Sequence, residues 1–117
     1  LSMGVQGKGD LIYLRYLDGS HLVVGHDSWG FPASESEPLE YDPSETIVVV
    51  VTLPAEAGGL EQAEWAVAWN DRRVIERRDH FHPTLASDIE IGWNKIGSSS
   101  AGISFGGTIV EGEWLKP

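Results

Sequence analysis

The chain contains no cysteine, so disulfide bonds and metal sites built on thiolates are excluded. Extracellular domains of this size also fold without disulfide bonds, and the location of the protein therefore stays undetermined. The length of 117 residues suits one domain with one hydrophobic core, so we treat residues 1–117 as a single domain. Leu1 and Ser2 precede Met3 and are interpreted either as residues added to the natural chain or as the edge of an excised segment.

Long apolar runs are also absent. The longest, Ile47–Leu53, is interrupted by Thr52 and has the length of a strand, whereas a membrane-spanning helix needs about 18 or more apolar residues. The chain does not open with the pattern of a signal peptide. We therefore expect a soluble protein without a transmembrane segment.

Positive charge is scarce, because 8 Lys and Arg residues stand against 18 Asp and Glu residues and the net charge is -10. Nucleic-acid binding needs a basic face, so this charge argues against nucleic acid as a partner. No Lys or Arg occurs between Arg15 and Arg72, although acidic residues are frequent there. These acids either keep the protein soluble or hold Ca²⁺, a hard cation that prefers carboxylate and carbonyl oxygens.

Two pairs of strand-like segments predict hairpins. The first pair, Asp10–Leu17 and Ser20–Asp27, flanks an Asp-Gly dipeptide, which indicates a type I′ turn with positive φ at both central positions. In the second pair, Trp65 and Trp69 alternate with smaller residues before Asn70-Asp71 turns the chain into a further strand. This alternation places both tryptophans in the core.

Three further segments have the composition of strands. Glu45–Leu53 is continuous and β-branched, which is typical of a strand buried on both faces. Asp88–Trp93 alternates, and Gly106–Leu115 is expected to form the last strand. Pro54–Ala66 is interrupted by glycines and predicts a loop with at most one helical turn, while Gly30–Pro43 is the longest polar connector. Many short strands between turn residues predict an all-β antiparallel β-sandwich.

The region from Asp88 to Ile109 contains a strand ending in Gly-x-Asn, a turn of small residues and then Phe-x-Gly-x-Ile. It resembles the closing strands of concanavalin A-like jelly rolls of the laminin-G type. The hairpin Ala66–Glu76 is similar to another hairpin of that family, except that Arg72 stands where glycine is common. The matching residues of the closing region are Ile91, Gly92, Asn94, Ile96, Gly97, Phe105, Gly107 and Ile109.

The resemblance implies a jelly-roll sandwich without a catalytic motif. Such sandwiches usually contain more chain than this one, so strands are either missing or supplied in another way. A short sandwich leaves a sheet edge open, and an open edge can pair with a second copy. A homodimer through that edge is therefore one expectation.

Five tryptophans give the chain candidate platforms for sugars, which stack on exposed aromatic rings while acids and amides bond their hydroxyls. Trp29 stands among polar residues and Trp93 precedes an asparagine, so each ring is either an exposed platform or packed. Trp114 is expected to pack near the C-terminus. The candidate ligand-binding residues are Trp29, Trp93, Asp27, Asn94 and His26.

Two metal sites are candidates. Laminin-G-type domains commonly hold Ca²⁺ at one rim with a carboxylate and backbone carbonyls, and the resemblance gives Asp27 that role, with Asn94 or Asp88 as its partner. The alternative is that Asp27 bonds its own turn. His80 and His82 point to one face of an extended segment, so they can share a divalent metal with Asp79 or a distant acid. The alternative for the histidines is a surface loop held by proline.

An enzyme would need a pair of acids. Asp88 with Glu90, and Glu111 with Glu113, stand two apart on expected strands, which permits the separation of about 5–5.5 Å that a retaining glycosidase needs. Solvent-facing strands show the same alternation. The preferred function is therefore non-catalytic binding of a carbohydrate or another surface ligand, with Ca²⁺ as a candidate cofactor. The alternatives are a structural, oligomerising module and a glycoside hydrolase.

Overall fold

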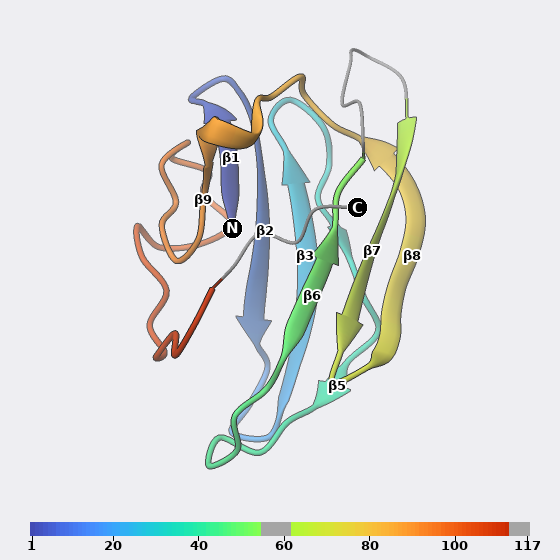
Figure 1. Ribbon diagram of the computed structural model, residues 1–117, viewed down its shortest axis with the longest axis vertical. Helices are drawn as coiled ribbons and strands as arrows, with labels where there is room; N and C mark the ends of the chain where they lie inside the picture. The colour runs from blue at the N-terminus through green and yellow to red at the C-terminus, as the bar shows by residue number, and fades with distance from the viewer. Residues whose placement is uncertain (55–61, 113–117) are drawn as a thin grey trace.

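The chain folds into two antiparallel β-sheets that pack face to face (Figure 1). The computed structural model describes residues 1–54 and 62–112. The six-stranded sheet has the order β4-β3-β2-β1-β9, with β5 also paired to β3, and the three-stranded sheet has the order β6-β7-β8. The elements are β1 (Ser2–Val5), β2 (Lys8–Tyr16), β3 (His21–Ser28), β4 (Ser34–Glu35), β5 (Leu39–Glu40), β6 (Val49–Thr52), β7 (Gln62–Trp69), β8 (Arg72–His80), the 3-10 helix η1 (Ala86–Asp88) and β9 (Ile89–Glu90).

This architecture confirms the predicted all-β antiparallel sandwich. Its core lies between the sheets, and Trp65 and Trp69 on β7 are only 2% and 9% exposed, as their alternation predicts. Burial of each large apolar side chain contributes about 1.5–3 kcal/mol. The buried core residues are Met3, Ile12, Leu22, Val24, Leu39, Trp65, Val67, Trp69, Ile75 and Phe81.

Both predicted hairpins form, but only one has the expected type of turn. Asn70 and Asp71 have φ values of 47° and 65°, as a type I′ turn between β7 and β8 requires. Between β2 and β3, neither Asp18 nor Gly19 has positive φ, so the expected type I′ turn is wrong. The connection is longer, and the Asp18 carboxylate accepts a 2.8 Å hydrogen bond from the backbone amide of Ser20.

A second, smaller core covers the outer face of the six-stranded sheet. Leu11 and Tyr13 on β2 pack there against Ile96, and Trp29 lies against this cluster. Because a Cβ at Gly25 would lie 2.2 Å from the Tyr13 ring, β3 needs glycine where that ring crosses it. The segment after β9 is therefore held on the outside of the sheet by apolar packing.

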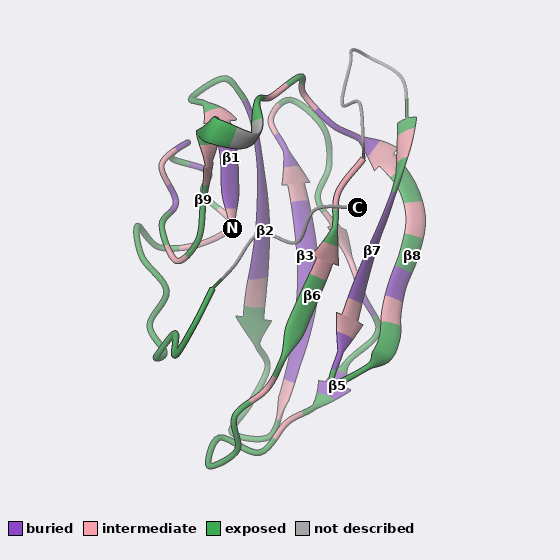
Figure 2. Cartoon of the chain, in the orientation of Figure 1, coloured by how far each residue is buried: buried purple, intermediate pink, exposed green. Residues whose placement is uncertain are grey.

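The prediction that Glu45–Leu53 is buried on both faces is wrong. Only Val49–Thr52 forms a strand, β6, which lies at the edge of the smaller sheet. Val48, Val49 and Val50 are 61%, 40% and 40% exposed (Figure 2). The apolar sequence thus lacks the neighbouring strand and the covering layer that would bury it, within the part of the chain that the structure describes.

The other strand predictions are corrected more locally. Of the strand predicted over Asp88–Trp93, only the short strand β9 forms, and its expected first residue, Asp88, belongs to η1 instead. The described part of the predicted last strand, residues 106–112, forms no strand, and the rest of it lies outside the described residues. The polar connector Gly30–Pro43 contains β4 and β5. Residues 55–61 of the predicted loop are not described, and Gln62–Ala66 belongs to β7.

Leu1 and Ser2 are integrated into the fold rather than attached loosely to it. Ser2 is fully buried in β1, which pairs with both β2 and β9. The carbonyl of Leu1 accepts a hydrogen bond from the backbone of Ile12 at 2.8 Å. Among the described residues, η1 is a three-residue helix, and no helix there is long and apolar enough to cross a membrane.

Candidate functional site

Of the two candidate sugar platforms, Trp29 and Trp93, Trp93 is the more exposed. Trp93 follows β9 and Gly92, and the φ of 79° at Gly92 turns the chain there. Trp93 is 49% exposed. The Trp93 carbonyl accepts a 2.5 Å hydrogen bond from the Ser2 hydroxyl, which fixes its backbone. Beside the ring is an open cavity of about 430 Å³, called the Trp93 cavity below. Its lining is Gln6, Trp93, Asn94, Lys95, Gly97, Ser98, Ala101 and Ile103.

Asn94 shapes this cavity and also retains an unused acceptor. Its side-chain amide donates hydrogen bonds to the carbonyls of Ser98 at 2.8 Å and Ala101 at 3.1 Å, which closes the loop. Asn94 is only 8% exposed, and its Oδ1 is buried without a hydrogen-bond partner among the described residues. A buried acceptor of this kind costs stability unless a ligand or water bonds it.

Asp27 approaches the same loop from β3. Its Oδ2 accepts hydrogen bonds from the hydroxyls of Ser98 and Ser100. These contacts differ from the expected bonding of Asp27 to its own turn, because they fasten a distant loop to the sheet. The described residues contain no group of three or more His, Asp or Glu side chains that could hold a metal ion. Asp27 therefore has a visible structural role, while a Ca²⁺ role remains an expectation.

Trp29 and His26 are less accessible than a sugar platform requires. Trp29 is partly buried against the cluster of Leu11, Tyr13 and Ile96. His26 is 2% exposed and lies between the two sheets. Trp29, Asp27 and Asn94 thus support the loop around the Trp93 cavity, whereas His26 belongs to the interior.

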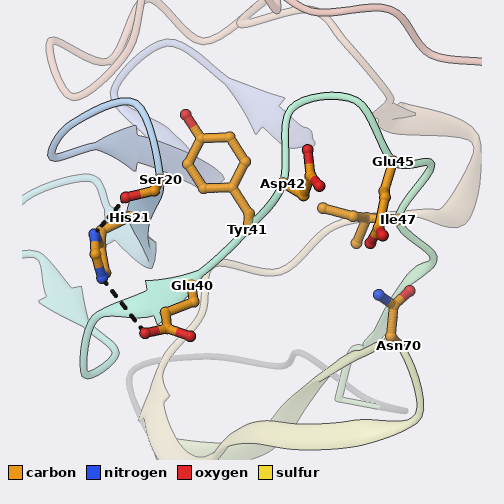
Figure 3. A pocket seen from close by; sticks show the side chains of 8 residues that line it. All are labelled: Ser20, His21, Glu40, Tyr41, Asp42, Glu45, Ile47 and Asn70. Atoms are coloured by element: carbon orange, nitrogen blue, oxygen red, sulfur yellow. Dashed lines mark hydrogen bonds and ion pairs between the residues drawn. The ribbon is translucent and has the colours of Figure 1, made fainter.

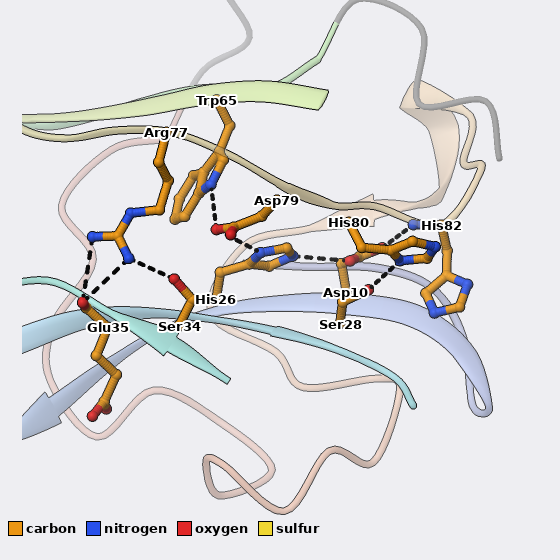
Figure 4. Close-up of polar contacts among 10 residues, drawn as sticks. All are labelled: Asp10, His26, Ser28, Ser34, Glu35, Trp65, Arg77, Asp79, His80 and His82. Atoms are coloured by element: carbon orange, nitrogen blue, oxygen red, sulfur yellow. Dashed lines mark hydrogen bonds and ion pairs between the residues drawn. The ribbon is translucent and has the colours of Figure 1, made fainter. Parts of the chain in front are cut away.

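His26 is the centre of a buried polar cluster that sequence analysis missed (Figure 4). Its Nε2 lies 2.9 Å from Oδ1 of Asp10, which is fully buried, and its Nδ1 lies 3.5 Å from Oδ2 of Asp79. Asp79 Oδ2 also accepts a 2.7 Å hydrogen bond from the Trp65 indole. The His26 ring stacks on Phe81 with centroids 4.1 Å apart. The cluster joins β2 and β3 of one sheet to β7 and β8 of the other.

His80 and His82 continue this cluster at its edge. His80 Nδ1 lies 3.0 Å from the Ser28 hydroxyl, and His82 Nε2 lies 2.8 Å from the Trp29 carbonyl. Asp79, the expected third ligand, instead contacts His26 and Trp65, so it does not join them. Burial lowers the pKa of His80 below its usual range, and neighbouring His82 lowers that pKa further, which favours a neutral imidazole.

A second open cavity lies where three loops meet at one end of the sandwich (Figure 3). Its volume is about 360 Å³. His21 bonds Asp18 at 3.0 Å and lies 3.8 Å from Glu40. Hydrogen bonds from the Ser20 amide and from His21 lower the pKa of Asp18 to about 2. The proximity of these loops was not predicted from the sequence. The lining residues are Ser20, His21, Glu40, Tyr41, Asp42, Glu45, Ile47 and Asn70.

The acid pairs of the glycosidase interpretation do not have the expected arrangement. Asp88 belongs to η1 and Glu90 to β9, so the two do not share one strand face. Glu111 is exposed in a segment without strand structure. Its expected partner, Glu113, lies outside the described residues, as does Trp114. The prediction that Asp88 and Glu90 lie on one strand is therefore wrong, and Glu111 does not lie on a strand either.

The residues around the Trp93 cavity can stack an apolar ring face and accept or donate hydrogen bonds, which are contacts that ligand sites use. In the cluster of Asp10, His26 and Asp79, the first two side chains are buried between the sheets and Asp79 is 20% exposed, and none of the three lines either described cavity. No family model matches the chain, and no curated protein and no solved structure was found to match it.

Proposed function

We propose that the chain is a non-catalytic binding module of the concanavalin A-like, laminin-G type that binds a carbohydrate in the Trp93 cavity. One observation carries the proposal. The exposed indole of Trp93 and the polar side chains of Gln6 and Lys95 line the same open cavity. An indole face stacks on the apolar face of a pyranose, and the amide of Gln6 and the ammonium group of Lys95 bond hydroxyls that lie beside it.

The size and the rigidity of the cavity support this function. A volume of about 430 Å³ falls within the range of about 300–1,000 Å³ that is common for ligand sites. Lys95 and Gln6 supply hydrogen-bond donors in the lining. Asp27 holds the loop through Ser98 and Ser100 and acts as a positioning residue. A Ca²⁺ ion with Asp27 and Asn94 among its ligands would strengthen that support.

Replacement of Trp93 by alanine is expected to weaken binding about 10- to 100-fold, because it removes about 1.5–3 kcal/mol of apolar contact. A glycan array, read with and without EDTA, first identifies the glycan that the wild type binds, and titration calorimetry then compares the variants. Tyr16→Ala removes another exposed aromatic ring, 51% exposed on β2, and should leave the affinity unchanged. Absence of binding to any glycan in both conditions, or equal affinities of W93A and wild type, would refute the proposal.

The exposed edge strand favours a second candidate function, a module that assembles through β6. The segment Ile47–Leu53 carries no charge in a strongly acidic chain, and it contains no proline or lysine that would discourage edge pairing. No strand of the described residues pairs with the outer edge of β6. Antiparallel pairing of two β6 strands would join two three-stranded sheets into one continuous sheet.

Sedimentation velocity tests this second function. The wild type is expected to form a dimer whose population grows with concentration, and Val50→Lys is expected to be monomeric because it places a charge in the paired edge. Val110→Lys changes a residue that is 78% exposed outside β6 and should dimerise like the wild type. A wild type that stays monomeric, or a V50K variant that still dimerises, would exclude assembly through this strand.

A further inference from the structure

His80 and His82 each have one ring nitrogen held by the protein, as metal-binding histidines usually do. The Trp29 carbonyl can only accept a hydrogen bond, so the contacting His82 Nε2 carries the proton and Nδ1 carries the lone pair. His80 Nδ1–H donates a hydrogen bond to the Ser28 hydroxyl. His80 Nε2 is then the nitrogen with the lone pair.

His80 Nε2 is also an unexplained atom in the fold. His80 is 8% exposed, and this nitrogen is buried with no hydrogen-bond partner among the described residues. Leaving a buried polar atom unpaired is destabilising, and a bound ion would remove that cost.

The separation and orientation of the two rings suit a shared ion. Their centroids lie 5.0 Å apart and their planes meet at 79° (Figure 4). Two imidazoles on a tetrahedral ion, with metal–nitrogen distances of about 2.0–2.1 Å, place their ring centroids about 5 Å apart. The His82 backbone is fixed by a 2.8 Å hydrogen bond from its amide to Asp10, so this spacing is held by the fold.

Phe31 controls access to this pair. Its ring stacks on His80 with centroids 3.9 Å apart and planes at 22°, and it meets His82 edge-on. Phe31 is 43% exposed and follows Gly30, whose φ is 91°. It is therefore a surface side chain at a turn, and its displacement would open His80 to an incoming ion.

We propose that His80 Nε2 and His82 Nδ1 bind one transition-metal ion such as Zn²⁺, with solvent in its remaining positions. Imidazole nitrogen suits Zn²⁺, Cu²⁺ and Ni²⁺, whereas Ca²⁺ prefers oxygen. With two protein ligands, the site is expected to bind more weakly than structural zinc sites with four. The site is independent of the Trp93 cavity, since the two share no lining residue.

Titration of the metal-free protein with Zn²⁺, followed by calorimetry, tests the proposal. The wild type is expected to bind one ion, and His82→Gln and His80→Gln should each weaken binding at least about tenfold. H82Q changes the less buried ring, so it serves if H80Q fails to fold, which circular dichroism will show. His21→Gln alters a partly exposed histidine at the second cavity and should bind Zn²⁺ like the wild type.

Competition and spectroscopy complete the test. Excess Ca²⁺ should not displace Zn²⁺, and the ring protons of His80 and His82 should shift together in NMR spectra as Zn²⁺ is added. Absence of Zn²⁺ binding by the wild type, undiminished binding by H82Q, or loss of binding in H21Q would each overturn the assignment.

Discussion

The variant Asp10→Ala is expected to lose about 3–5 kcal/mol of unfolding free energy. Asp10 is fully buried, and its two oxygens accept hydrogen bonds from different elements, His26 on β3 and the backbone amide of His82. Removal of the carboxylate leaves both donors without a partner between the sheets. Because domains of this kind are stable by only about 5–15 kcal/mol, a large share of the stability would be lost.

Urea unfolding followed by circular dichroism measures this loss. Asp10→Asn keeps the size of the side chain and one acceptor oxygen, so it should lose less stability than D10A. The control is Asp88→Ala, since Asp88 is exposed and its side chain makes no hydrogen bond to the described residues. D88A should stay within about 0.5 kcal/mol of the wild type. If D10A were to lose less than about 1 kcal/mol, Asp10 would not be a structural link between the sheets.

The variant Phe81→Ala is also expected to lose about 3–5 kcal/mol, because truncation of a buried phenylalanine leaves a cavity. Phe81 is 1% exposed, stacks on His26 at 4.1 Å between centroids and meets the Trp65 ring edge-on at 5.8 Å. Phe81 belongs to the apolar core and contacts the polar cluster through the His26 ring. Its removal would therefore cost packing and also admit water beside His26.

Calorimetry should show a fall in Tm of about 10–20 °C for F81A. Phe81→Leu keeps most of the volume and should cost less than about 1.5 kcal/mol if neighbouring side chains repack. The matched control is Phe105→Ala, because Phe105 is 37% exposed outside both cores. A Tm for F81A that lies within a few degrees of the F105A value would contradict the central position of Phe81.

Polar side chains of functional interest lie both between the two sheets and near the surface. The interior cluster of Asp10, His26 and Asp79 links the sheets, and its groups are almost fully paired with one another. Among the described residues, three side-chain atoms outside that pairing are buried without partners: His80 Nε2, Thr84 Oγ1 and Asn94 Oδ1. The metal proposal begins from His80 Nε2 and the carbohydrate proposal from the exposed Trp93 ring, and the two are tested by separate variants.

The features that were predicted correctly are those that residues adjacent in the chain decide. The alternation of Trp65, Val67 and Trp69 is enough to make a strand with one apolar face, and the adjacent Asn-Asp pair tolerates positive φ. The all-β class follows from many such segments. Local patterns also pointed to Trp93 and Asn94, but they did not reveal that one ring is open and the other side chain buried.

The sequence by itself therefore determined the class of the fold, the two hairpins and the core position of two tryptophans. Only the tertiary structure decided that β6 is an exposed edge, since burial of a strand depends on which distant strands lie beside it. It also decided that Asp10 meets His26 and His82, because residues far apart in the chain come together only when the sheets pack. Local periodicity carries no information about such pairings, and the buried polar cluster depends on them entirely.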